Sequence, residues 1–295
     1  MKAGQTSVHL SLLATTVRVQ HESACPDIGP ICAERDEPPQ LHDQRFAIGE
    51  LRASLEHGLT DALGVELQLP LRLNRTTIQF RRLDGTPVTL DYENIHHRDE
   101  TLFGLGDPWL MGRYAFSLGG VRLATRVGFT VPLGRTEEDP FALGEAGQPH
   151  QHVQFGTGTV QPLLALEAGR QWGSWGARLW GQAQLSLVEN HHGFRSGNRF
   201  GFGLAGLFKL GSSLRLSAGA DLAHEQPERW NGVVQQDGNL GRTDVLLGGG
   251  LHWSVKDVTL GLTVQVPVYT HIIGHHGQLE YPGLLGLTAG TTFGG

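Results

Sequence analysis

Histidine is the residue type in this sequence that is best suited to coordination chemistry. The chain has 295 residues and 15 histidines, and neutral imidazole is a common protein ligand of zinc and copper. In an extended segment the rings of His150 and His152 lie on one face, and His271 is close in sequence to the pair His275-His276. The candidate metal ligands are therefore His96, His97, His150, His152, His191, His192, His271, His275 and His276.

Solvated loop histidines are the alternative to a metal site. No histidine segment has the spacing of a zinc finger or of a metalloprotease helix. Zinc or copper is the ion that such a site would hold, and no cofactor is certain from the sequence. Further ligands would come from nearby carboxylates, namely Asp99, Glu100, Asp139 and Glu280.

The two cysteines, Cys25 and Cys32, indicate the redox compartment. They lie in one polar segment with Pro and Gly between them. In an oxidising cell-surface environment such a pair is expected to form a disulfide. Metal binding by the pair is the alternative, although the spacing differs from the tight one of zinc and redox motifs.

Motifs of catalysis are not found. The chain has no nucleophile elbow, phosphate loop or haem attachment motif, so we expect no enzyme, and a surface hydrolase is the less favoured alternative. The net charge of -6 disfavours nucleic acid as a partner.

The elements that would position these residues are long strands. Val65, Leu67, Leu69, Leu71 and Leu73 alternate with polar residues and a proline, and 121–133 and 258–268 repeat the pattern. Strands of soluble proteins are usually shorter. Alternating segments of about ten residues separated by turn residues are typical of a transmembrane β-barrel with lipid outside and a polar lumen inside.

Composition agrees with a barrel. No run of 18 apolar residues is present, so no helix is expected to span a membrane. Only 39% of the residues are hydrophobic, as expected when half of each strand faces water. A single closed barrel uses this length as one domain, 1–295.

Counting the alternating segments gives an all-β, antiparallel up-and-down barrel of about twelve strands. We place them at 6–20, 44–57, 64–80, 104–117, 121–134, 156–170, 175–189, 198–210, 213–224, 242–253, 257–269 and 283–293. Short and long connections alternate, so we expect short periplasmic turns and long extracellular loops, with most histidines in the loops. An interfacial girdle near the short turns is expected from Phe116, Trp172, Trp175, Phe208, Trp253 and Phe293.

The amino terminus lacks the basic stretch and apolar run of a secretory signal. It reads instead as a first strand, with Val8, Leu10 and Leu12 alternating. We expect the numbering to describe a mature or recombinant form of an exported protein.

Charged residues on the polar faces of the strands are expected to line the lumen. They are Glu50, Arg52, Glu56, Glu66, Arg72, Arg113, Arg122, Arg126, Glu167, Arg178, Arg215 and Asp221. They either line a selective water-filled path or neutralise one another in a packed interior. Twelve strands enclose a lumen wider than that of eight-stranded barrels and narrower than that of open porins.

Four motifs carry a family resemblance. They are Gly104-Leu-Gly-Asp-Pro-Trp-Leu-Met-Gly-Arg-Tyr114, Thr130-Val-Pro-Leu-Gly134, Phe155-Gly-Thr-Gly-Thr159 and Gln265-Val-Pro-Val-Tyr269. With these motifs in this order, the chain resembles the outer-membrane transporter family named for the MetA pathway of phenol degradation. The resemblance covers roughly residues 45–293. The resemblance implies a channel-like barrel for small hydrophobic compounds and transfers no catalytic residue.

Together these patterns predict a barrel in the outer membrane of a Gram-negative bacterium, surrounded by lipid. It is expected to admit a small molecule or a metal ion through a histidine-rich mouth. A closed structural or adhesion barrel, with loops that bind a partner, is the alternative. The oligomeric state stays open.

Overall fold

The computed structural model describes residues 1–23, 40–90, 94–95, 97–236, 238–273 and 280–294. Cys25, Cys32, His96, His275 and His276 lie outside the described residues. The disulfide and part of the proposed metal site therefore stay predictions.

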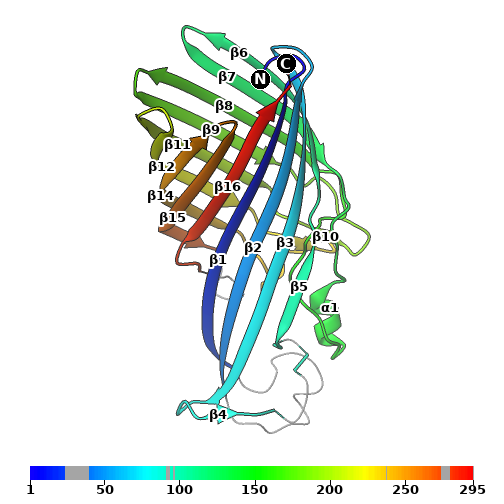
Figure 1. Cartoon of the computed structure of the whole chain (residues 1–295). Helices are drawn as coiled ribbons and strands as arrows, with labels where there is room; N and C mark the ends of the chain where they lie inside the picture. Colours follow the sequence, from blue (N-terminus) through cyan, green and yellow to red (C-terminus); the bar gives the residue numbers. More distant parts are fainter. Residues whose placement is uncertain (24–39, 91–93, 96, 237, 274–279, 295) are drawn as a thin grey trace.

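Long antiparallel strands make up most of the described chain (Figure 1). The strands of the barrel wall are β1 (Thr6–Ser23), β2 (Gln40–Gly58), β3 (Leu63–Arg82), β5 (Glu100–Leu105), β6 (Trp109–Leu118), β7 (Val121–Thr130), β8 (Pro162–Trp172), β9 (Trp175–Gln184), β11 (Arg199–Leu210), β12 (Leu214–Glu225), β14 (Arg242–Val255), β15 (Val258–Ile272) and β16 (Leu284–Phe293). Short elements outside the wall are β4 (Pro87–Val88), α1 (Pro140–Glu145), β10 (Phe194–Arg195) and β13 (Arg229–Trp230).

The sheet closes on itself. Each wall strand pairs with its sequence neighbour, and β16 pairs with β1 from Thr6 opposite Phe293 to Ala14 opposite Leu285. Both β5 and β6 pair with β3, so they form one interrupted strand. The described residues thus form a twelve-stranded closed barrel, as the sequence predicts.

The interruption between β5 and β6 was not predicted, and the register against β3 shifts by one residue across it, from Leu71 opposite Leu105 to Gln68 opposite Trp109. Pro108 has no N–H for the ladder, and the N–H of Gly106 donates to the carbonyl of Pro70 at 2.8 Å. The strands predicted at 121–134, 156–170 and 175–189 are also shorter on the loop side. The first of them ends before Pro132, which likewise cannot donate to a ladder.

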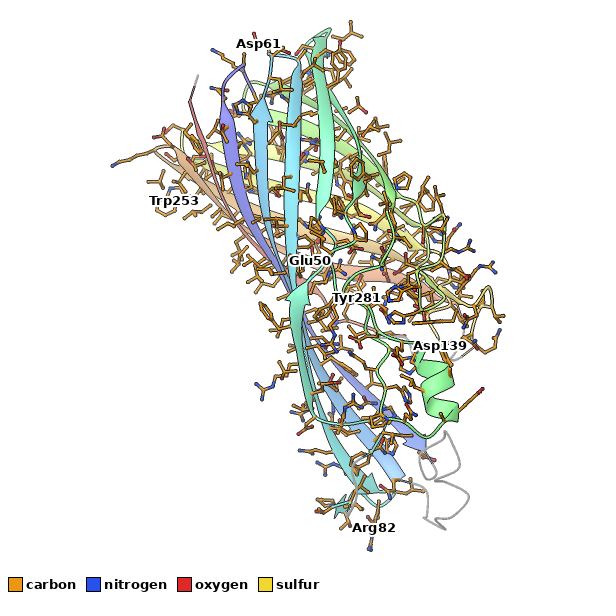
Figure 2. The ribbon with its side chains drawn as sticks, turned by 90° about the vertical axis from the view of Figure 1, so that its right-hand side faces the viewer. Glu50, Asp61, Arg82, Asp139, Trp253 and Tyr281 are labelled. Atoms are coloured by element: carbon orange, nitrogen blue, oxygen red, sulfur yellow. The ribbon has the colours of Figure 1, made fainter. Side chains whose placement is uncertain are left out.

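Alternating side chains give the barrel an apolar outer surface. On β3, Val65, Leu69 and Leu73 are about two-fifths exposed, whereas Glu66 and Asn74 on the opposite face of the strand are buried. Trp172, Trp175, Trp253 and Phe293 are exposed near the short turns, and Figure 2 shows Trp253 on the outer surface. An apolar belt with an aromatic border is the surface that lipid requires.

The two ends of the barrel differ. Both chain termini lie at the end that carries the short turns, whereas α1 and β4 lie at the opposite end (Figure 1). In Figure 2, Asp61 in a short turn and Arg82 at the end of β3 mark these ends. The expected alternation of short periplasmic turns with long extracellular loops is confirmed. Among the described residues, no helix is long and apolar enough to cross a membrane.

Candidate functional site: the barrel lumen

Ion pairs cover one wall of the lumen. Glu50 lies near the middle of the barrel (Figure 2), and its carboxylate is 2.5 Å from Arg52 and 2.9 Å from Arg72. Alternation and register place all three side chains on the inner face of β2 and β3. Their mutual neutralisation makes this part of the wall polar without a strong net field.

Arg126 on β7 is the centre of the ion-pair network. Its guanidinium contacts Glu66 at 2.6 Å, Glu167 at 2.8 Å and Glu56 at 3.3 Å, and Arg113 contacts Glu56 at 2.6 Å. Strands β2 and β7 are separated by β3 and β6. A direct pair between Arg126 and Glu56 therefore spans the concave interior, so the structure places both side chains on the inner face.

The remaining charged residues also lie on the inner face. Arg178 is 3.4 Å from Glu167, Arg122 is on the same face of β7 as Arg126, and the Cα partner of Arg215 is His252. Asp221 accepts hydrogen bonds from Trp180 Nε1 at 3.0 Å and from Gln265 Nε2 at 2.5 Å. These two donors come from β9 and β15, which again requires contact across the interior.

The opposite wall carries no formal charge. Between Ser7 and Thr15 on β1, Thr259 and Gln265 on β15, and Leu284 and Thr292 on β16, every inward position holds an uncharged residue or a histidine. Inward glycines occupy part of this wall, namely Gly248, Gly250, Gly261, Gly286 and Gly290.

Neighbouring side chains lie flat over these glycines. A Cβ at Gly250 would be 2.6 Å from Ser217 Oγ, and one at Gly286 would be 2.2 Å from Thr263 Oγ1. Sequence reasoning missed this wall because it searched for charges. The signal was present in the uncharged hydroxyl residues at the inward positions of β15 and β16, such as Thr263 and Thr288.

A buried aspartate holds a long loop at the extracellular mouth. Asp107, between β5 and β6, is 6% exposed. One carboxylate oxygen accepts from the N–H of Gly134 at 2.9 Å, and the other accepts from both the N–H and the hydroxyl of Thr157, each at 2.7 Å. Asp107 thus fixes both ends of the segment 131–161 to the wall.

Three of the four resemblance motifs meet at this aspartate. A Cβ at Gly134 would be 2.6 Å from the Cα of Gly156 and 2.9 Å from the carbonyl carbon of Gly106, so only glycine permits this close backbone approach. Phe155 packs on Gly104, and its carbonyl accepts from Arg72 Nη1 at 2.7 Å. The segment therefore enters the lumen beside the ion-pair network.

Aromatic packing joins the loops into a cap on one side of the mouth. Trp230, 1% exposed, is 4.9 Å from Phe194 and 6.5 Å from Phe141 of α1, measured between ring centroids. Asn231 Nδ2 donates to Asp139 at 2.9 Å, and Asp139 lies at the start of α1 (Figure 2). We call residues 131–161, 186–198 and 226–236 the cap.

Glu228 and Tyr281, which lie outside the spanning strands, have raised pKa values. Burial raises the pKa of Glu228, whose carboxylate accepts from Trp230 Nε1 and from the N–H of Asn239. Burial and the neighbouring Asp244 carboxylate raise the pKa of Tyr281 to about 12. Both groups are uncharged over a wider pH range than an exposed counterpart.

Most of the described candidate histidines lie in pairs. The ring of His150 is 5.4 Å from that of His152, the ring of His97 is 5.0 Å from that of His42, and His191 stacks on His192 at 3.8 Å. His271 is on β15. Among the described residues, no group of three or more His, Cys, Asp or Glu side chains is placed to hold a metal ion. The metal hypothesis stays a prediction.

Two serine–histidine pairs are found, and both face the lumen. Ser217 Oγ is 3.3 Å from His252 Nε2, and Ser7 Oγ is 3.1 Å from His9 Nε2. Within the described part of the chain, neither histidine is hydrogen-bonded to a carboxylate. A hydrolase triad needs such a carboxylate to orient the imidazole.

The closed sheet, the apolar belt and the polar lumen define the class of the protein. It is a bacterial outer-membrane β-barrel of twelve strands. No family model and no curated protein matches the chain, so the resemblance to the MetA-pathway family stays a prediction.

Solved structures share this fold. The chain is similar to an outer-membrane channel from Pseudomonas putida F1, with a TM-score of 0.65 and 16% identity over 99% of this chain and 97% of the other. Weaker likeness extends to the toluene transporter TbuX of Ralstonia pickettii, with a TM-score of 0.44 and 10% identity over 99% of this chain and 90% of the other. The toluene transporter TodX of P. putida has a TM-score of 0.42 and 9% identity over 100% of this chain and 91% of the other. The likeness to the first structure supports the fold.

Proposed function

We propose that this protein is an outer-membrane channel for a small uncharged solute. The observation that carries the proposal is the division of the lumen into a paired, charged wall and an uncharged wall of glycine, serine and threonine. Neighbouring side chains such as Thr263 lie over these glycines, so this wall is expected to project less into the lumen than the arginines and glutamates opposite. The path is therefore expected to run along β14, β15, β16 and β1.

The chemistry of the two walls favours an uncharged solute over an ion. Arg126 is shared by three carboxylates, so its charge is already compensated within the wall. Hydroxyl groups such as those of Thr263 and Thr288 can form weak, exchangeable hydrogen bonds with a passing molecule. Weak contacts at several places permit passage rather than capture.

The comparison supports the barrel fold on which the proposal rests. The channel of P. putida F1 shares the fold over nearly its whole length. Toluene transporters are found among the weaker matches, and the family resemblance in the motifs points to small hydrophobic compounds.

A tryptophan scan of the lumen tests where the path runs. Thr288→Trp places a bulky side chain on the uncharged wall, and the matched control Ala115→Trp places the same side chain on the inner face of β6. In liposome swelling, we expect T288W to slow entry of a small uncharged solute severalfold and A115W to change it less than twofold. Equal blockage by both variants, or by neither, would contradict the proposed path.

A further inference from the structure

The outer surface of β1, β2 and β3 changes from apolar to cationic over a short distance. On β3 the outward residues are aliphatic up to Leu73, and the next outward residue is Arg75. At about 3.3 Å per residue and a tilt of about 40°, the stretch from Leu63 to Leu73 rises about 25 Å, the height of the apolar band of an outer-membrane barrel. Arg75 therefore lies just beyond the acyl chains on the extracellular side.

The neighbouring strands carry arginines at the same level. Arg18 on β1 is the Cα partner of Arg45 on β2. Ala47, the next residue of β2 on the same outer face, is the Cα partner of Arg75 on β3. Like charges directly opposite each other on adjacent strands are unfavourable. The carboxylate of Asp43 forms an ion pair with Arg18 at 2.7 Å and offsets the charge of that arginine. Within the described residues, Arg45 and Arg75 have no ion pair or side-chain hydrogen bond.

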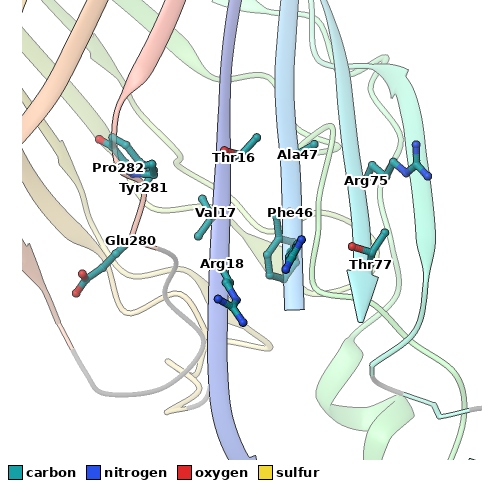
Figure 3. Close-up of a pocket in the computed structure, with 11 residues that line it drawn as sticks. Thr16, Val17, Arg18, Phe46, Ala47, Arg75, Thr77, Glu280, Tyr281 and Pro282 are labelled. Atoms are coloured by element: carbon teal, nitrogen blue, oxygen red, sulfur yellow. The ribbon is translucent and has the colours of Figure 1, made fainter. Parts of the chain in front are cut away.

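These arginines line a cavity of about 710 Å³ (Figure 3). Because β16 begins at Leu284, the extracellular half of β1 pairs only with β2. Residues 280–282 line the cavity on the side of β1 that faces away from β2. Thr16 and Thr77 add hydroxyl groups, and Glu280 is the one carboxylate among the described residues of the lining. The lining thus carries three guanidinium groups and a single carboxylate.

We propose that this cavity binds the phosphorylated headgroup of an outer-leaflet lipid, whose acyl chains lie along the leucines below it. A guanidinium matches a phosphate group with two parallel hydrogen bonds. The chain as a whole has a net charge of -6, so the cationic patch is a local feature. The cationic patch borders the apolar belt on the extracellular side, and this position fits a ligand that carries both acyl chains and phosphate.

The surface on the far side of the barrel lacks this pattern. The last outward residues on the extracellular side include Phe200 on β11, His224 on β12 and His271 on β15, and none is Arg or Lys. One arginine on the outer face, Arg170, lies at the periplasmic end of β8, over the Trp172 ring. The proposed lipid therefore occupies one side of the barrel.

The double variant Arg45→Gln/Arg75→Gln tests the proposal, and Arg170→Gln is its matched control on the same outer surface. The probe is lipopolysaccharide titrated onto the detergent-solubilised barrel, with heat-modified gel migration as the check of folding. We expect the double variant to bind at least tenfold more weakly and the control to stay within twofold of the unmodified protein. Equal binding by all three proteins would overturn the proposal, as would an equal loss in the control.

Two further probes separate a lipid from a free anion. Dephosphorylated lipopolysaccharide should bind as weakly to the unmodified protein as intact lipopolysaccharide binds to the double variant. Inorganic pyrophosphate carries the same phosphate chemistry without acyl chains, so it should compete only at far higher concentration. Competition by pyrophosphate at the concentration of the lipid would assign the cavity to a soluble anion and contradict a lipid site.

Discussion

Asp107 accepts hydrogen bonds from both the backbone N–H and the hydroxyl of Thr157, each 2.7 Å long. The two residues are 50 positions apart in the sequence, and their contact ties a loop of the mouth to the one interrupted strand of the described wall. The proline that breaks this strand frees the turn in which Asp107 lies. The interruption is thus the feature that anchors the cap.

Replacing Asp107 by alanine should destabilise the barrel and loosen its mouth. Three hydrogen bonds to a buried carboxylate are lost, and the N–H groups of Gly134 and Thr157 lose their partner, so we expect a loss of about 3 kcal/mol in the free energy of unfolding. Urea unfolding in lipid micelles, followed by tryptophan fluorescence, measures it. The exposed turn residue Asp84 provides the control D84A, and a D107A variant as stable as that control would refute the anchoring role.

Arg126 is expected to be essential for packing of the charged wall. Arg126→Met leaves Glu56, Glu66 and Glu167 without their shared partner, and removal of one member of a partly buried ion-pair network costs about 3 kcal/mol or more. The second variant R126M/E66Q/E167Q removes most of the repulsion and should recover stability. If the single variant unfolds at the same urea concentration as the unmodified protein, the network does not stabilise the wall.

The cap should be more stable at low pH through Glu228. Burial raises the pKa of this carboxyl in the folded protein above its ordinary value of 4.5. The neutral form is therefore favoured by folding, and its contribution is fully present below the unfolded pKa and is lost as the pH rises through the folded pKa. Glu228→Gln should remove this dependence.

Hydrogen exchange of the backbone around Trp230 checks this pH effect. We expect faster opening of the cap at about pH 8 than at about pH 4, after correction for intrinsic exchange rates, and no such difference in E228Q. An identical pH response in the variant would assign the effect to other groups.

The metal hypothesis is tested on the described pair His150 and His152. If zinc or copper binds at the mouth, H150A/H152A should lose stoichiometric binding in calorimetry while keeping its fold. His9 lies in the lumen and was not among the candidate ligands, so H9A is the control. Unchanged metal affinity in the double variant removes these two residues as ligands, and the absence of binding by the unmodified protein removes the site altogether.

The strands could be predicted because lipid and water impose opposite chemistry on alternate residues. The leucines of β3 and the inward position of Glu66 follow directly from that rule. The three partners of Arg126 could not be predicted, since they come from strands whose relation depends on closure and register of the whole sheet. The anchoring role of Asp107 could not be predicted either, because its partners lie in Gly- and Pro-rich segments that have no periodicity.

Passage of solutes through the unmodified barrel tests the central proposal most directly. Liposomes that contain the purified protein are swollen in a small uncharged solute and in anionic and cationic solutes of the same size. We predict rapid swelling with the uncharged solute and slower swelling with both ions. Swelling no faster than in protein-free liposomes, for every solute, would contradict a channel and favour a closed barrel.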